Sequence, residues 1–322
     1  MKKTVILFCL VFLFCLNGCS TDPISHEFFA MDTVMKVTVY NENDRSLLAA
    51  AQQKVEALES LLSVTNQTSD IYKTNVAGTL SLSPDTTELL SLALALHKET
   101  NGLFDITVYP AVKAWGFTLD KNRVPSQEEL ATLLPLIGSD KIALQGNTLS
   151  LSKGTEIDLG GIAKGYAADK VAEQLQAAGC GGAVLSFGGN VKTIGQKPDG
   201  NLFQIAVQDP ASQTNTLGTL SVAGNTAVVT SGDSQRYFEQ DGVKYHHIID
   251  PRTAAPANSD LSSVTVICQS ATKADAYATA LFIMGLEEGL KFVEEKADIE
   301  AVFVTKNKEI HLSTGAKKIF TP

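Results

Sequence analysis

Apolar residues recur along this sequence at two spacings, one typical of strands and the other of helices. Residues 35–40 alternate between apolar and polar side chains, which predicts a half-buried strand. Apolar residues between positions 47 and 62, and again between 86 and 96, follow helical spacing. We expect Asp85 or Thr86 to cap the second of these helices. The first part of the chain therefore combines strands with helices.

The second half of the chain combines the same two spacings. An apolar stripe after Ile162 predicts a helix that Gly179 ends in a left-handed conformation. Hairpins are expected at 141–144 with 148–151 and at 301–304 with 310–312, other strands at 183–187, 203–207, 217–222, 226–230 and 263–268, and other helices at 274–283 and 286–295. No linker or short repeat divides these elements. The prediction is a single compact α+β domain of mixed sheets and helices, with a division into two lobes left open.

The N-terminus has a different pattern. Lys2 and Lys3 precede an uninterrupted apolar stretch, Val5 to Leu16, that is shorter than the roughly 18 residues of a membrane-spanning helix. This order is typical of a secretory signal. The segment Leu16-Asn17-Gly18-Cys19 resembles the bacterial lipobox, in which the cysteine is lipidated after cleavage. The alternative is ordinary signal cleavage, with Cys19 incidental.

The lipobox divides the chain into three expected parts. Residues 1–18 form a lipoprotein signal peptide, residues 19–28 a lipid-anchored tether, and residues 29–322 the folded domain. We expect an extracytoplasmic protein that is anchored to a bacterial membrane through a lipid such as palmitate on Cys19, on the cell-membrane or periplasmic side.

Composition excludes some functions. The 322 residues include 26 Lys and Arg against 35 Asp and Glu, a net charge of −9, which provides no basic surface for a nucleic acid. Loss of two lysines with the signal makes the charge −11. Only Cys180 and Cys268 remain in the folded part, so a disulfide framework is excluded. A single bridge between them is left open, although Cys268 lies in an apolar run and is expected to be a small buried residue.

The most informative polar segment is Asp158-Leu159-Gly160-Gly161-Ile162-Ala163-Lys164-Gly165-Tyr166, between an expected strand end and a helix start. Glycines let a ligand approach the backbone, and the first amides of a helix carry unpaired N–H groups that can receive phosphate. The structural alternative is a glycine-rich turn that serves only tight packing. Short glycine motifs alone do not separate the two.

Three later segments also concentrate polar groups and glycines. Residues 186–190 form a second glycine cluster at a strand end, residues 230–237 follow the next strand, and residues 245–252 contain adjacent histidines. Neighbouring residues of a strand face opposite ways, so only one of His246 and His247 can face a given site. The alternative for each is a hydrogen-bonded or solvated imidazole without a role in chemistry.

Asp275 and Thr279 stand four residues apart in a helix of small apolar residues, and therefore on one helical face. Carboxylate and hydroxyl oxygens suit a hard cation such as Mg²⁺. The alternative is that Asp275 caps the helix and Thr279 bonds back to its own helix.

In this order, these segments resemble the ApbE family of FAD:protein FMN transferases. The resemblance covers nearly all of the mature chain. Its motifs are Met31-Asp32-Thr33, Gly102–Thr107, Ala114-Trp115-Gly116, Asp158–Tyr166, Gly188-Gly189-Asn190, Thr230–Asp233, His247–Pro251 and Asp275–Thr279. The expected lipoprotein signal also fits the family.

The resemblance implies a Mg²⁺-dependent transfer of FMN from FAD to a threonine hydroxyl of another protein, with AMP as the second product. It also suggests an acceptor among extracytoplasmic or membrane redox subunits. Two alternatives share most of the residues: a Mg²⁺-dependent FAD pyrophosphatase that gives FMN and AMP, and a flavin-binding lipoprotein without chemistry. A mere carrier would not need the Asp275 and Thr279 pair, whereas the hydrolase and the transferase differ only in the acceptor.

The resemblance also implies roles for individual residues. His247 is the candidate general base, and Asp275 is the second residue counted as catalytic. The cation would be held by Asp275, Thr279 and the carbonyl of Gly161. The residues expected to contact FAD are Met31, Ala114, Trp115, Gly116, Asp158, Lys164 and Ile249. Trp115 offers a flat face beside a glycine, and its alternative role is that of a structural anchor.

The sequence departs from the family pattern at three positions. Asp32 stands where relatives usually have glycine, Lys164 where some have an acid, and Ala278 where some have a second carboxylate. The Asp275 and Thr279 pair is unaffected. Asp32 puts the flavin contact by Met31 in question, and Ala278 could weaken or change metal occupancy.

Overall fold

The computed structural model describes residues 22–322, except 119–120 and 213. The expected signal peptide and Cys19 lie outside the described residues. Within the described part, we find no helix that combines the length and the apolar character needed to cross a membrane.

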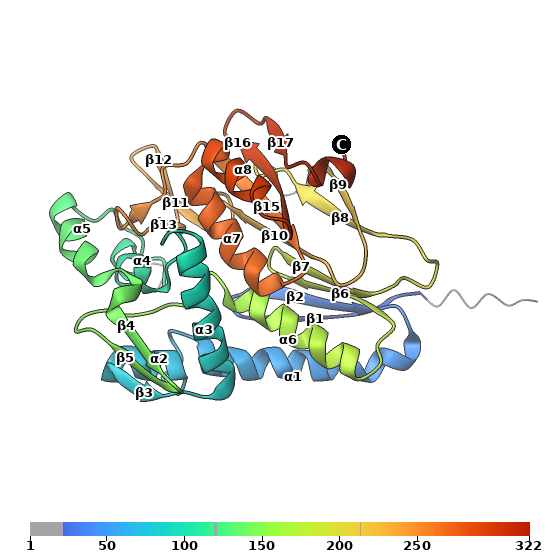
Figure 1. Cartoon of the computed structure of the whole chain (residues 1–322), viewed down its shortest axis with the longest axis horizontal. Helices are drawn as coiled ribbons and strands as arrows, with labels where there is room; N and C mark the ends of the chain where they lie inside the picture. The colour runs from blue at the N-terminus through green and yellow to red at the C-terminus, as the bar shows by residue number, and fades with distance from the viewer. Residues whose placement is uncertain (1–21, 119–120, 213) are drawn as a thin grey trace, which may run out of the picture.

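An eight-stranded antiparallel sheet forms the centre of the molecule (Figure 1). Its strands, in spatial order, are β1 (Ile24–Ala30), β2 (Thr33–Val39), β6 (Gly182–Phe187), β7 (Asn190–Gly195), β10 (Ala227–Gly232), β15 (Leu261–Cys268), β16 (Ile299–Thr305) and β17 (Ile310–Leu312). Alternate side chains of these strands face opposite sides, so Val229 and Val228 belong to two different hydrophobic clusters. The sheet therefore separates two cores.

Helices cover one face of this sheet, and a small sheet covers the other (Figure 1). The helices are α1 (Arg45–Leu62), α3 (Pro84–Glu99), α6 (Ala163–Ala177), α7 (Ala271–Met284) and α8 (Leu286–Glu294). The small sheet consists of β8 (Phe203–Gln208), β9 (Thr216–Val222) and β18 (Phe320–Thr321). Helix α7 is buried almost all round, since it lies between the sheet and other helices.

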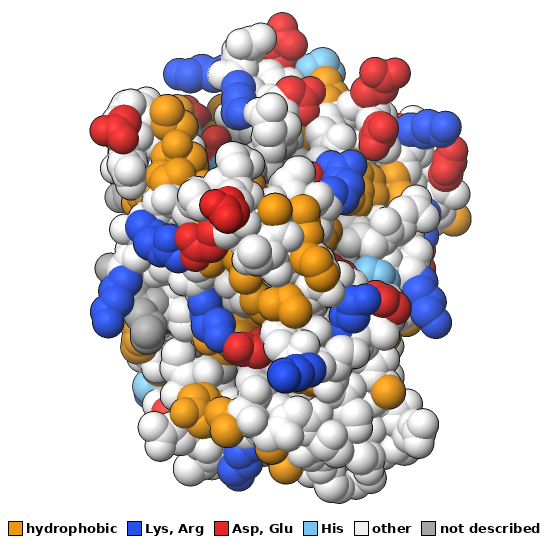
Figure 2. Space-filling view, turned by 90° about the vertical axis from the view of Figure 1, so that its left-hand side faces the viewer, with side chains coloured by type: hydrophobic (Ala, Val, Ile, Leu, Met, Phe, Trp, Pro, Cys, Tyr) orange, Lys and Arg blue, Asp and Glu red, His pale blue; other side chains and the backbone are white. Residues whose placement is uncertain are grey.

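A third group of short elements lies at one end of the sheet, on the left of Figure 1. It comprises α2 (Asp70–Ala77), α4 (Tyr109–Trp115), α5 (Gln127–Leu133), β3 (Thr79–Ser81), β4 (Ile142–Gln145), β5 (Thr148–Leu151), β11 (Tyr237–Gln240), β12 (Val243–His246), β13 (Ile249–Asp250) and β14 (Ala255–Pro256). Short 3-10 helices span Glu42–Asp44, Ile106–Val108, Leu134–Leu136, Ser139–Lys141 and Ala316–Lys318. On the face of this end that Figure 2 shows, acidic and basic side chains are interspersed.

The α+β prediction is confirmed, and most predicted elements are present. The capping prediction for α3 is wrong: Ser83 is at the N-cap and the helix begins with Pro84, so Asp85 and Thr86 lie inside its first turn. The expected tether is also too long, because β1 begins at Ile24 and pairs with β2 along its whole length. The residue types of β1 do not alternate, because three polar residues (25–27) are followed by three apolar ones (28–30), so the strand is not visible in the sequence.

Candidate functional site

The glycine-rich segment and the Asp275 helix meet where α6 crosses α7. A Cβ atom on Gly165 would lie 2.2 Å from the carbonyl oxygen of Ala271, so no other residue fits there without displacement of a helix. The backbone N–H of Gly165 donates to Oδ2 of Asp275 at 2.9 Å. Since Gly165 is in the first turn of α6, this N–H has no partner within its own helix. Asp275 thus satisfies the N-terminus of α6 from a neighbouring helix.

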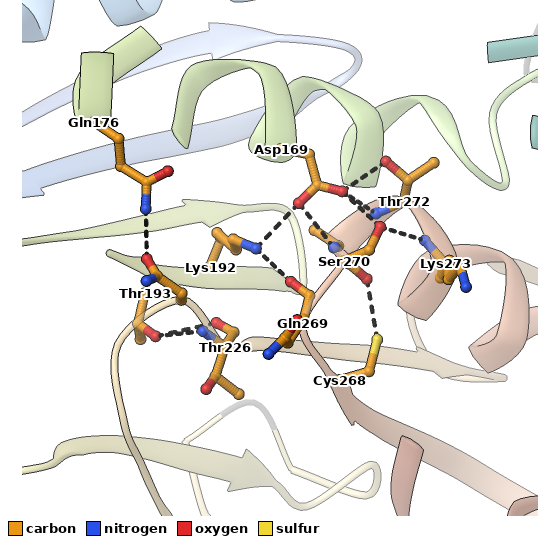
Figure 3. Close-up of polar contacts among 12 residues, drawn as sticks. Asp169, Gln176, Lys192, Thr193, Thr226, Cys268, Gln269, Ser270, Thr272 and Lys273 are labelled. Atoms are coloured by element: carbon orange, nitrogen blue, oxygen red, sulfur yellow. Dashed lines mark hydrogen bonds and ion pairs between the residues drawn. The ribbon is translucent and has the colours of Figure 1, made fainter. Parts of the chain in front are cut away.

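Helix α6 does the same for the N-terminus of α7 (Figure 3). The Asp169 carboxylate accepts from the N–H groups of Ala271 and Thr272 at 2.9 Å each, and from the hydroxyls of Ser270 and Thr272 at 2.8 Å. Lys192 lies 3.2 Å from the same carboxylate. Each helix therefore supplies a carboxylate to the other's positive N-terminal end, which fixes their crossing.

The Thr279 side chain lies close to Gly161, and the Asp275 side chain contacts Gly165 in the same glycine-rich segment. A Cβ atom on Gly161 would be 3.8 Å from the Thr279 hydroxyl oxygen. Asp275 is 4 % exposed and lies in the second turn of α7, whose N-cap is Ser270. Asp275 is therefore not the cap of its own helix, and among the described residues the Thr279 hydroxyl has no hydrogen-bond partner. The described residues therefore show neither Asp275 as a helix cap nor a bond from Thr279 back to its own helix.

The chemistry of this group fits a hard cation. Asp275 uses Oδ2 for Gly165, and no described residue donates to its Oδ1. The Thr279 hydroxyl and the backbone at Gly161 supply further oxygens of the kind that Mg²⁺ prefers. The described residues hold no cluster of three or more His, Cys, Asp or Glu suited to a metal. A cation here would therefore take part of its coordination from oxygens of the bound substrate.

Lys164 and Asp158 border this group. Lys164 Nζ lies 3.9 Å from Oδ2 of Asp275 and donates to the carbonyl of Gly160 at 3.3 Å. Asp158 accepts from the N–H of Gly160 at 2.8 Å. Burial raises the pKa of the Asp158 carboxyl, against the opposing effect of Gly160, Arg236 and Lys164. The segment thus forms a tight turn, and the Asp158 carboxylate fixes the backbone of Gly160 within it.

The motif Gly102–Thr107 supports the same turn from below. Asp105 accepts from the N–H of Thr107 at 2.8 Å, which caps the 3-10 helix that leads to α4. The carbonyl of Ile106 accepts from the N–H of Asp158 at 2.8 Å, and a Cβ on Gly161 would lie 3.4 Å from the ring of Phe104. The motif therefore supports the glycine-rich turn through one main-chain hydrogen bond and the packing of Phe104.

The two adjacent histidines face opposite ways, as predicted. Nε2 of His246 lies 3.0 Å from the carbonyl of Ala257, and its ring meets Phe282 edge-on. His247 is half-buried, and its Nδ1 lies 3.1 Å from the carbonyl of Arg236. A carbonyl only accepts, so Nδ1 carries the proton of the neutral ring and Nε2 keeps a free lone pair. Burial lowers the pKa of His247 to about 4, with Lys164, His246 and Arg236 acting in the same direction.

The turn between β1 and β2 contains Met31 and Asp32, and Asp32 lies near Arg236, whose carbonyl contacts His247. Met31 and Asp32 both have positive φ, 48° and 64°, a conformation that glycine adopts more easily. The N–H of Met31 donates to Glu59 of α1 at 2.9 Å, and Asp32 lies 3.6 Å from the Arg236 guanidinium. The departure from glycine at position 32 is thus accommodated by a left-handed turn.

Trp115 lies in the core, contrary to the expectation of an open aromatic face. The indole is 3 % exposed, donates to the carbonyl of Ala254 at 2.9 Å, and packs against Tyr245 with ring centroids 5.2 Å apart. Ile249 belongs to the same cluster. The Trp115 side chain therefore makes the contacts expected of a structural anchor, and it also borders a cavity of about 500 Å³ on the His246 side. Its flavin contact stays a prediction.

The two neighbours of Trp115 differ from it: Ala114 is more exposed to solvent, and Gly116 has a backbone conformation that requires glycine. Ala114 is half-buried at the end of α4. Gly116 has a φ of 85°, and a Cβ there would lie 2.0 Å from the carbonyl oxygen of Lys121, so glycine is required. The sequence reasoning assigned no role to Arg236, Glu59 or Phe117, which connect the segments of this region. Of these three residues, only Arg236 lies in a segment, residues 230–237, where the sequence concentrates polar groups.

Comparison with known proteins agrees with this geometry. The model of the ApbE family matches residues 31–303. A FAD:protein FMN transferase of Klebsiella pneumoniae is 33 % identical over 92 % of this chain and 94 % of the relative, and one of Vibrio cholerae is 37 % identical over 71 % and 69 %.

Solved structures show the same fold. The ApbE protein of Thermotoga maritima has a TM-score of 0.88 and 31 % identity, with 94 % of this chain and all of that chain covered. The flavin transferase ApbE of Vibrio cholerae has a TM-score of 0.83 and 29 % identity, over 92 % and 99 %. The resemblance found in the sequence is confirmed, and this chain belongs to the ApbE family.

Proposed function

We propose that this protein transfers FMN from FAD to a threonine hydroxyl of an acceptor protein and releases AMP, with Mg²⁺ as cofactor. Its relatives are FAD:protein FMN transferases, so the chain is an enzyme of the transferase class. The observation that carries the finer proposal is that Thr279 approaches Gly161 and Asp275 approaches Gly165, so two oxygen-bearing side chains keep free acceptor atoms beside a glycine-rich helix start.

The cation would be held by Asp275, Thr279 and the Gly161 carbonyl, and when bound it supplies positive charge for a diphosphate and for the departing AMP. The protein itself contributes the first turn of α6, whose N–H groups and partial positive charge favour phosphate. Lys164 adds a cation at the same turn. These groups offset the acidic character of the whole chain at one place.

His247 is the proposed base for the acceptor threonine. The threonine oxygen forms a bond to the phosphorus of the FMN moiety, the bond from that phosphorus to the AMP oxygen breaks, and the hydroxyl proton passes to Nε2 of His247. That atom is unprotonated at neutral pH, since burial lowers the pKa of His247 to about 4. Because His247 is a weak base, it accepts the hydroxyl proton only while the bond between the threonine oxygen and phosphorus forms.

The location of the acceptor follows from the proposed lipid anchor. If Cys19 is lipidated, the acceptor is an extracytoplasmic protein or the exposed part of a membrane redox subunit. The FAD contacts proposed for Met31, Ala114, Gly116, Asp158 and Lys164 remain part of the proposal. For Trp115 and Ile249, which lie in a core cluster, the proposed contact is limited to atoms at the surface of that cluster.

The test incubates the mature protein with FAD, Mg²⁺ and an extracytoplasmic protein that exposes a threonine among small residues such as Ser/Gly-Ala-Thr. In-gel flavin fluorescence and intact mass are measured, with a Thr→Ala acceptor and a chelator as controls. Covalent FMN on that threonine supports the proposal. Release of FMN and AMP without a labelled acceptor identifies a pyrophosphatase, and FAD bound without turnover identifies a carrier.

A further inference from the structure

Arg236 connects three segments that lie far apart in the sequence. Its guanidinium donates to the carbonyl of Phe117 at 2.7 Å, directly after Gly116. The same group lies 3.6 Å from Asp32, in the turn that contains Met31. Its main-chain carbonyl accepts from the N–H of His247 at 3.0 Å and lies 3.1 Å from Nδ1 of the ring. One residue thus touches both flavin-binding segments and the proposed base.

We propose that Arg236 is a positioning residue for the transfer reaction: its side chain ties residue 236 to the segment after Gly116, and its carbonyl then orients the imidazole of His247 toward the acceptor. This inference rests on the proposed function. The residue immediately precedes β11, and β11 and β12 form an isolated two-stranded hairpin, outside the eight-stranded sheet. Packing of Phe238 and Tyr245 on Trp115 holds the body of the hairpin, and the Arg236 side chain ties its start.

The contact with Phe117 carries the argument, and the contact with Asp32 contributes little. Side-chain exposure is 46 % for Arg236 and 78 % for Asp32, and ion pairs this exposed are screened by solvent. A charge-assisted hydrogen bond to a carbonyl is directional, and it fixes the path of the chain at residue 236. Since Phe117 is buried with Trp115 in one cluster, the tie is made to a rigid part of the molecule.

The orientation of His247 depends on the carbonyl of residue 236. That carbonyl accepts from both the main chain and the ring of His247, so a shift of residue 236 moves the imidazole directly. A base must lie within hydrogen-bond reach of the proton that it accepts. A small displacement of the ring would therefore lower the rate of transfer more than it changes FAD binding, because no hydrogen bond or ion pair among the described residues joins Arg236 to the glycine-rich turn.

The experiment compares Arg236→Met, which keeps the stem and loses the donors, with Arg236→Lys, which keeps a donor. Arg123→Met is the matched control: Arg123 has a similar exposure, 50 %, and pairs with Glu129. We expect Arg236→Met to lower kcat for flavin transfer by about tenfold or more, with the KM for FAD changed less than about threefold. Arg236→Lys should recover to within about threefold, and Arg123→Met should match the wild type.

Three results would overturn the proposal. One is transfer by Arg236→Met within about twofold of the wild type. A second is a loss that appears in KM for FAD instead of kcat. The third is an equal loss in Arg236→Lys that is accompanied by an equal fall in melting temperature, since this would indicate a purely structural role.

A spectroscopic readout separates this proposal from the proposed function. Two-bond ¹⁵N–¹H spectra of the histidine rings report which nitrogen of His247 carries the proton. We expect a single tautomer with the proton on Nδ1 in the wild type and a mixture in Arg236→Met. An unchanged tautomer in the variant would contradict the proposal. A wild-type protein that labels no acceptor contradicts the proposed function alone.

Discussion

The two halves of the candidate site are built in different ways. At the crossing of α6 and α7, the contacts are buried and short: Gly165 leaves no room for a Cβ, and Asp275 is 4 % exposed. At the opposite rim, Arg236 and Asp32 meet on turns with side chains that are largely exposed. The first half is fixed by packing, whereas the side chains that meet in the second half are more open to solvent. In the proposed reaction, the packed half would receive the phosphates and the more exposed half would face the acceptor.

Loss of Asp275 should have the largest effect. Asp275→Ala removes the only carboxylate proposed for the cation and leaves the N–H of Gly165 without its acceptor. We expect Mg²⁺-dependent turnover to fall to background, measured by AMP release. Asp298→Ala, at a side chain that is 69 % exposed, is the control. Full activity in Asp275→Ala would refute the metal assignment.

His247→Ala should have the next largest effect and should separate the two halves. General bases contribute about 10²–10⁴-fold to rate. We expect a loss of transfer of about 100-fold or more with FAD affinity retained, measured by flavin fluorescence titration. Unchanged transfer would remove His247 as the base, and a loss of FAD binding would show that the rim is not separate from the phosphate end.

The pH dependence tests the environment of His247. Because the pKa of His247 is lowered to about 4, the acid limb of kcat/KM should lie near pH 4 and not near 6.5. Between these values the unfolded chain binds a proton that the folded protein does not. The corresponding stability is present above pH 6.5 and is lost as the pH falls toward 4. Denaturant titrations of the wild type and His247→Ala should therefore converge with rising acidity; parallel curves would contradict this.

Gly165→Ala tests the rigid half through packing alone. A methyl group 2.2 Å from the Ala271 carbonyl forces the helices apart, and overpacking of this kind costs about 1–3 kcal/mol. We expect a lower melting temperature and a higher Mg²⁺ requirement. Gly181→Ala is the matched control, since a Cβ there meets no atom within 4 Å and its φ is not positive. Equal stability of the two variants would argue against the close crossing.

Asp32→Gly should have the smallest effect. It relieves a positive φ, removes an exposed carboxylate near an anionic ligand, and costs only a screened ion pair. We expect the KM for FAD to fall by up to about threefold at low salt and the difference to vanish at about 0.5 M salt. A rise in KM would show that Asp32 helps to hold the ligand.

Local patterns were enough to predict most of the fold. Long periodic segments such as α1 and α7 bury one or more faces, so their spacing is visible in the sequence. Helices α2, α4 and α5 were missed because they have only seven or eight residues, too few for a helical period to show. Strand β1 is as long as β2, but its residue types do not alternate. The cap of α3 was predicted two or three residues too late, because the apolar period begins after Pro84, the residue that starts the helix.

The site was predictable where ordered motifs carry it and not where distant segments meet. Thr279 lies near Gly161 and Asp275 contacts Gly165, so the two ordered motifs meet in space, and the metal site itself stays a prediction. Arg236 could not be assigned a role, since its contact with Phe117 spans more than a hundred residues. The buried position of Trp115 had the same cause, because Phe238 and Tyr245 cover it from a hairpin late in the chain.

The reciprocal capping of α6 and α7 has a consequence for amide exchange. The N–H of Gly165 is released only if the carboxylate of the other helix leaves, and the N–H groups of Ala271 and Thr272 depend on Asp169 in the same way. These three protons should therefore exchange together, and only in the rare openings that separate the two helices. Ligand entry at the rim would leave their exchange unchanged. Slow exchange at these three positions would mark the phosphate end as preformed before FAD arrives.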